Sequence, residues 1–92
     1  MELTGHIHVI HPRQDVSDNY EKQEVVIKTE GQYPQYITVS FFQDKCNLLN
    51  PYVEGDYVTI RINLRGREWV SPQGETKYFN EISGYSIFQP QN

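Results

Sequence analysis

Cationic and aromatic side chains gather between residues 55 and 87 of this chain. Two arginines and a tryptophan come first, then a turn sequence, then a lysine and two more rings: Arg65, Arg67, Trp69, Ser71-Pro72-Gln73-Gly74, Lys77, Tyr78 and Phe79. Flat rings stack on unpaired nucleobases, and guanidinium or ammonium groups bind the phosphates that join them. The chemistry that these residue types predict is noncovalent binding of an unpaired nucleic-acid strand.

Two strands must position these groups. Apolar residues alternate with polar ones ahead of the tryptophan, as Val58, Ile60, Ile62 and Leu64 against Thr59, Arg61, Asn63 and Arg65. This period of two predicts a strand with one face in a core and an exposed, partly cationic face. A last strand is predicted from about Tyr78 to Phe88, with a bulge at Gly84. A hairpin from Trp69 to Tyr78 then joins the two strands.

The earlier part of the chain predicts three more strands and a short helix. The strands are expected at Leu3 to Ile10, Glu24 to Thr29 and Tyr36 to Phe42, with residues 13–20 as a loop. A helical turn or two is expected at Asp44 to Leu49, with Asp44 as its N-cap. This order is that of an all-β, five-stranded OB-fold, a Greek-key barrel with a short helix between strands 3 and 4. SH3-like barrels share much of it.

The segment LRGREWVSPQGETKYFNEI, residues 64–82, carries a family resemblance. It resembles the fourth strand, hairpin and fifth strand of bacterial single-stranded DNA-binding proteins, in which Leu-Arg-x-Arg-x-Trp precedes a Gly-containing turn and a Tyr-x-x-Glu-hydrophobic strand. Over nearly its whole length the chain also resembles a family of short proteins from Bacteroidetes and their phages. The resemblance implies an OB-fold, stacking of bases on Trp69, phosphate contacts at Arg65 and Arg67, and assembly as a dimer or tetramer. Bacterial single-strand binders end in an acidic tail that recruits partner enzymes. The last residues here are Phe88-Gln89-Pro90-Gln91-Asn92, so recruitment through such a tail is not expected.

We therefore expect a largely sequence-independent single-stranded DNA-binding protein that serves replication, recombination or repair. The expected nucleic-acid site comprises Trp69, Arg65, Arg67, Tyr78, Lys77, Tyr36, Arg61 and Phe42, with Tyr33 as a further candidate. Tyr78 and Phe79 fall on opposite faces of a strand, so at most one should reach a ligand while the other packs into the barrel. Two simpler interpretations stay open. Trp69 could be a core or interface residue, and the cations could be solvated surface charges.

Charge is the main objection to this interpretation. The 92 residues carry a formal net charge of −4, whereas phosphate binding draws on a positive field. The charge is polarised along the sequence, however. Between Tyr57 and Phe79 four cations stand against Glu68 and Glu75, and the earlier stretch is rich in acidic residues, which are Asp15, Asp18, Glu21, Glu24 and Glu30. RNA remains an alternative ligand, and a protein-binding OB module is the alternative function.

Other classes of function find little support in the sequence. The length predicts one domain, residues 1–88, followed by a frayed tail at residues 89–92. His6 and His8 share ligand spacing on a strand, but His11 breaks the pattern, so surface histidines are favoured over a metal site. No catalytic constellation or cofactor motif is present, and we expect neither enzyme activity nor a cofactor. One cysteine, Cys46, and no apolar membrane segment favour the cytoplasm.

Overall fold

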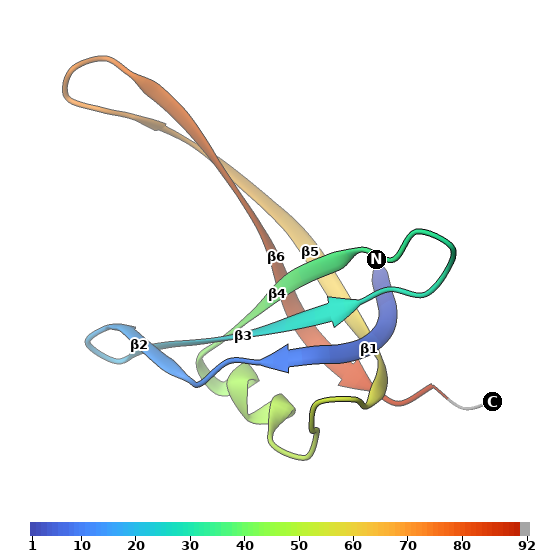
Figure 1. Ribbon diagram of the computed structural model, residues 1–92. Coiled ribbons are helices and arrows are strands. Elements are labelled where there is room, and N and C mark those ends of the chain that lie inside the picture. Colours follow the sequence, from blue (N-terminus) through green and yellow to red (C-terminus); the bar gives the residue numbers. More distant parts are fainter. Residues whose placement is uncertain (91–92) are drawn as a thin grey trace.

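Alternating apolar and polar residues form six strands in the computed structural model, which describes residues 1–90 (Figure 1). One 3-10 helix, η1, interrupts them. The elements are β1 (Glu2–Ile10), β2 (Gln14–Ser17), β3 (Tyr20–Lys28), β4 (Tyr36–Phe42), η1 (Gln43–Leu49), β5 (Tyr57–Val70) and β6 (Thr76–Phe88). Of the tail predicted at residues 89–92, the last two residues lie outside the described part of the chain.

Five of the strands close into a barrel. β1 pairs antiparallel with both β3 and β5, β3 pairs with β4, and β5 pairs with β6. The ring is completed where β4 and β6 run parallel and meet at Ser40 and Ser83. This pattern is the OB-fold, so the predicted fold class is confirmed. The sixth strand, β2, pairs with β3 and lies outside the ring.

The barrel interior takes every second residue of the strands, as the sequence pattern predicted. Fully or almost fully buried side chains from the strands are Ile7, Val25, Ile27, Val39, Phe41, Val58, Ile60 and Ile62. Helix η1 adds Cys46 and Leu49 to this core. The Cys46 thiol donates to the Phe41 carbonyl oxygen at 3.3 Å, and burial raises its pKa. Within residues 1–90 there is no helix with the length and apolar character that crossing a membrane requires.

Position 84 of β6 requires glycine, because no space is left there for a side chain. A Cβ atom at this position would lie 2.5 Å from Cζ of the Phe41 ring in the core. The predicted bulge is confirmed beside it, because Arg61 pairs with Ser86 while Ile62 pairs with Gly84, which leaves Tyr85 as the extra residue. The bare backbone at Gly84 therefore makes room for the largest buried ring.

Two local predictions are wrong. Residues 13–20 are not a loop, because β2 and the start of β3 form a hairpin there, with Asn19 at φ 63° in its turn. Asp44 is not an N-cap: that position belongs to Phe42, and no side chain within residues 1–90 caps the helix. The side chain of Gln43 instead accepts from the Glu21 amide and donates to the Asn19 carbonyl, each at 2.9 Å. The helix start is thus tied to a hairpin distant in sequence.

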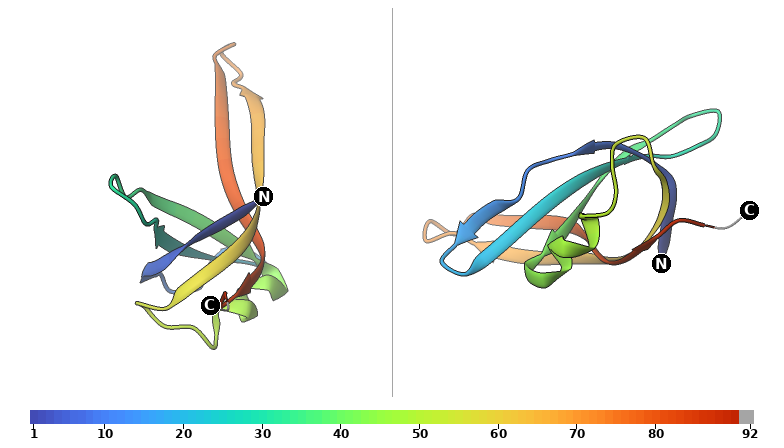
Figure 2. Two further views of the ribbon diagram at one scale, coloured as in Figure 1. Left: turned by 90° about the vertical axis from the view of Figure 1, so that its right-hand side faces the viewer. Right: turned by 90° about the horizontal axis from the view of Figure 1, so that it is seen from below.

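The β5–β6 hairpin projects far beyond the barrel (Figure 2). The two strands stay paired out to Val70 and Thr76. The predicted turn is confirmed, with the Gly74 amide donating to the Ser71 carbonyl at 2.9 Å and Gly74 at φ 87°. We call residues 64–82 the arm. It explains a radius of gyration of 14.9 Å, against about 12 Å expected for a compact chain of this length.

Candidate nucleic-acid interface

The arm presents two faces, because directly opposed residues of paired strands point the same way. Arg65 is opposite Glu81, Arg67 is opposite Phe79, and Trp69 is opposite Lys77. We call the face made by these residues the outer face of the arm, since it continues the exposed side of the barrel. The opposite side is the inner face of the arm, made by Leu64, Gly66, Glu68, Val70, Thr76, Tyr78, Asn80 and Ile82.

Each ring on the outer face of the arm has a cation beside it. The Arg67 guanidinium carbon lies 5.3 Å from the centre of the Phe79 ring, and Lys77 Nζ lies 6.0 Å from the centre of the Trp69 ring. These are distances at which a cation is attracted to an aromatic face. Trp69 is 42% exposed and Phe79 is 47% exposed. The outer face thus offers two partly open rings, each held next to a positive charge.

Charge is polarised in space as well as along the chain. The outer face of the arm carries three cations, Arg65, Arg67 and Lys77, and one carboxylate, Glu81, which leaves a net charge of +2 on this face. Glu68 is on the inner face, and Glu75 belongs to the turn. The protein as a whole carries −4. A phosphate approaching the outer face therefore meets a locally positive surface on an anionic molecule.

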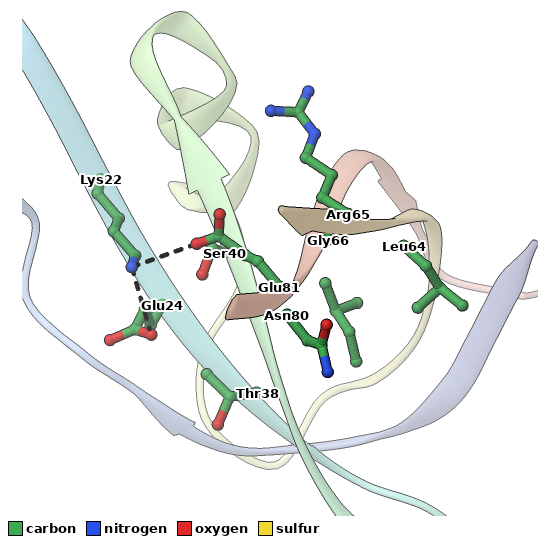
Figure 3. A pocket seen from close by; sticks show the side chains of 10 residues that line it. Lys22, Glu24, Thr38, Ser40, Leu64, Arg65, Gly66, Asn80 and Glu81 are labelled. Carbon is green, nitrogen blue, oxygen red and sulfur yellow. Dashed lines mark ion pairs between the residues drawn. The ribbon is translucent and has the colours of Figure 1, made fainter. Parts of the chain in front are cut away.

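A groove lies at the root of the arm (Figure 3). β4 and β6 meet at Ser40 and Ser83 and then diverge toward their N-terminal ends. The groove has a volume of about 650 Å³ and receives side chains from β3, β4, β5 and β6. Lys22 Nζ lies 3.3 Å from a Glu81 carboxylate oxygen and 3.9 Å from one of Glu24. An adjoining depression shares Lys22 and Glu81 and adds Arg67 and Phe79, so the groove lies next to the outer face.

Four of the predicted site residues come together on the outer face of the arm, namely Trp69, Arg65, Arg67 and Lys77. Tyr78 does not join them, because it lies on the inner face, 71% exposed. The expectation that one of Tyr78 and Phe79 packs into the barrel is wrong, since the arm extends beyond the barrel and has no interior there. Phe79 is the ring that the site prediction left out. If residue pairs are counted outward from the turn, Phe79 falls opposite Arg67. The hairpin register could therefore have identified Phe79 as a site residue.

The other predicted site residues lie on the barrel wall. Arg61 donates from Nε to a Glu2 carboxylate oxygen at 3.2 Å and is held in an ion pair. Tyr36, 58% exposed, has Lys28 Nζ 5.8 Å from its ring centre. Phe42 is half-buried at the other end of β4. Tyr36 and Phe42 share the outer side of β4 with Ser40 of the groove, whereas Arg61 is on β5 beside β1. Tyr33 is exposed in the loop between β3 and β4.

The histidines of β1 pack against tyrosines. His6 lies 4.9 Å from Tyr57 between ring centres, and His8 lies 5.0 Å from Tyr36 in an edge-on contact. A Glu30 carboxylate oxygen is 3.8 Å from His6 Nδ1. Among the residues that the structure describes, no group of three or more His, Cys, Asp or Glu side chains is arranged to hold a metal ion. These histidines contribute to the aromatic wall of the barrel.

Comparison with protein families identifies a match that spans most of the chain. The model of a family described as a domain of unknown function (DUF3127) matches residues 2–88. Curated proteins yield no match to the sequence.

Comparison with solved structures finds single-stranded DNA-binding proteins. One is a mitochondrial single-stranded DNA binding protein from S. cerevisiae, with a TM-score of 0.70 and 17% identity, over 100% of this chain and 94% of that chain. Another is a small single-stranded DNA-binding protein from Streptomyces coelicolor, with a TM-score of 0.62 and 14% identity, over 98% of this chain and 92% of that chain. At such low identity the likeness establishes the fold alone.

Proposed function

Because this chain belongs to the DUF3127 family and has the OB-fold of single-stranded DNA-binding proteins, we propose that it binds single-stranded DNA largely independently of sequence. The observation that carries the proposal is the outer face of the arm, where two exposed rings alternate with three cations. Stacking on a ring tolerates any base, since every base has a flat face. Phosphate contacts likewise carry no direct sequence information.

The spacing of the outer face suits a strand of stacked nucleotides. The pairs Arg67–Phe79 and Trp69–Lys77 are two residues apart along each strand, about 7 Å. Bases in a stacked strand rise by about 3.4 Å each, so the distance between the two pairs corresponds to two nucleotides. In this arrangement bases stack on Trp69 and Phe79 while the cations contact the intervening phosphates. The binding step is noncovalent, and no catalytic role is part of the proposal.

The proposal includes a cellular setting that follows from the resemblance. We propose that the protein, a single domain over residues 1–88, acts in replication, recombination or repair in the cytoplasm of Bacteroidetes or of cells infected by their phages. By analogy with single-strand binders it works as a dimer or tetramer. Several short binding surfaces held together raise the effective affinity for one strand. RNA is an alternative ligand of the same surface.

Tryptophan fluorescence tests the proposed function directly, because Trp69 is the only tryptophan. Addition of oligo(dT) at low salt is expected to quench the emission, and added salt is expected to reverse the quenching as counterions compete for the phosphates. A mobility shift with single-stranded DNA, RNA and duplex ranks the ligands. Unchanged emission together with no mobility shift of the single strand would remove the proposal.

Arg67→Gln should weaken binding and flatten its salt dependence. The slope of log affinity against log salt is negative, and removing one phosphate contact to a single strand makes it less steep by about 0.7. Arg61→Gln is the matched control, because Arg61 is on the barrel wall and is already paired with Glu2 at 3.2 Å. Its slope should stay close to that of the unaltered protein. If the salt dependence of Arg67→Gln is as steep as that of Arg61→Gln, the phosphate contacts do not lie on the arm.

A second candidate function is supported by the inner face of the arm. Leu64, Val70 and Tyr78 are 63%, 57% and 71% exposed there. Exposed apolar side chains grouped on one face are typical of a protein-binding surface. In that case the chain is an OB-fold interaction module that does not bind nucleic acid itself. Purified protein that leaves the fluorescence and mobility of every oligonucleotide unchanged favours this alternative.

A further inference from the structure

The groove at the root of the arm differs in charge from the outer face beside it. Lys22 and Arg65 contribute two positive charges to its lining, and Glu24 and Glu81 contribute two negative charges, so these four cancel. Both carboxylates lie within ion-pair distance of the same ammonium, that of Lys22. A phosphate entering here meets two carboxylates and a lysine that is already paired. Phosphates are therefore favoured on the outer face, and an uncharged group is favoured in the groove.

The lining of the groove suits the edge of a nucleobase. Leu64 and Ile82 supply apolar surface from the arm, and Thr38 supplies a hydroxyl from β4. In Figure 3 the carboxylates of Glu24 and Glu81 and the ammonium of Lys22 lie close together beside the groove. The carboxylates are acceptors only, and the ammonium is a donor only. A base that presents an amino group next to a ring nitrogen or carbonyl oxygen matches this set.

We propose that the groove at the root of the arm is a base-selective subsite, in which Glu24 and Glu81 accept hydrogen bonds from the exocyclic amino group of a base. Cytosine fits, because its amino group donates to a carboxylate while the ring nitrogen beside that group accepts from Lys22. Adenine and guanine also carry an exocyclic amino group. Thymine places a carbonyl oxygen where cytosine has its amino group, and two acceptors facing each other repel.

The groove lies where the DNA strand that stacks on the arm can reach it. The depression that contains Phe79 and Arg67 shares Lys22, Arg65 and Glu81 with it, so the two lie side by side. A strand that stacks its bases on the outer face can therefore turn one base into the groove. The inference rests on the proposed function: stacking on the arm gives sequence-tolerant affinity, and the groove adds a preference at one position.

Oligo(dC) and oligo(dT) of equal length, about 8 to 16 nucleotides, test the subsite at pH 8. Trp69 emission and mobility shifts measure both affinities. The unaltered protein is expected to bind oligo(dC) about fivefold more tightly, at the lower end of what a direct base contact contributes, because the groove is open to solvent. Equal affinities would overturn the inference and leave the proposed function standing. No binding of either oligonucleotide would remove both.

Glu81→Gln separates base recognition from general charge. An amide both donates and accepts, so the variant can satisfy thymine as well as cytosine, and the ratio of the two affinities should fall toward one. Glu68→Gln is the matched control, because it removes one negative charge from the inner face of the same strand pair. It should raise both affinities alike and keep the ratio. A ratio that stays unchanged in Glu81→Gln, or that falls equally in Glu68→Gln, contradicts the inference.

Discussion

Trp69→Ala is expected to bind oligo(dT) roughly ten- to a hundredfold less tightly while the domain stays folded. Loss of one stacking ring typically costs about 1 to 3 kcal/mol of binding free energy. Trp69 is 42% exposed on an arm that lies beyond the barrel core, so its removal leaves the buried side chains of the barrel in place. Mobility shifts measure the affinity, because the variant has no tryptophan emission, and circular dichroism with thermal melting measures the fold.

Two other rings of the arm provide matched controls. Tyr78→Ala removes an aromatic ring from the inner face and should change the affinity little. Phe79→Ala removes the second ring of the outer face and should weaken binding in the same direction as Trp69→Ala. Loss of folding in Trp69→Ala would instead make the tryptophan a structural residue. Equal losses of affinity in Tyr78→Ala and Phe79→Ala would show that the DNA does not distinguish the two faces of the arm.

Among the substitutions proposed here, Phe41→Ala should lower the free energy of unfolding most. The Phe41 ring is fully buried in the barrel core, and its removal leaves a cavity that the surrounding strands close only in part. A change of this kind typically lowers the free energy of unfolding by about 3 to 5 kcal/mol. Urea denaturation followed by circular dichroism measures it. A loss below about 1 kcal/mol would mean that the ring is not packed as described.

Gly84→Ala tests the same contact from the other strand. Its Cβ would lie 2.5 Å from the Phe41 ring, so the free energy of unfolding should fall by about 1 to 3 kcal/mol. The penalty should shrink in a Phe41→Leu background, where the ring is gone. Gly66→Ala is the control, since its nearest neighbour is the flexible Asn80 side chain at 3.3 Å. Additive effects of the Gly84 and Phe41 substitutions would exclude direct contact between the two positions.

The barrel could be predicted from the sequence because its signal is local. Period-two alternation gave the bounds of β4 without error, and it identified Val58, Ile60 and Ile62 as core residues. The same alternation continues to Leu64, which the structure shows to be 63% exposed. The pattern does not reveal where neighbouring strands stop covering β5. That point is set by the length of β1 and by the divergence of β4 from β6, which are properties of the closed barrel.

The candidate site was predictable in part for a related reason. Arg65, Arg67 and Trp69 share parity on one strand, so their common face could be inferred. Which residues of β6 join them depends on hairpin register, and this is what brings Phe79 to the outer face and Tyr78 to the inner face. The groove at the root of the arm was not predicted, because Lys22, Glu24 and Glu81 meet only when strands distant in sequence come together.

The meeting of β4 and β6 at Ser40 and Ser83 also bears on how the chain folds. The hairpins β3–β4 and β5–β6 connect neighbouring segments, and such contacts form early because little chain entropy is lost in closing them. The seam joins residues separated by nearly half of the sequence, and its strand pairing within residues 1–90 is centred on Ser40 and Ser83. We therefore expect ring closure at this seam to be a late step in folding, which follows both hairpins and is slower than either of them.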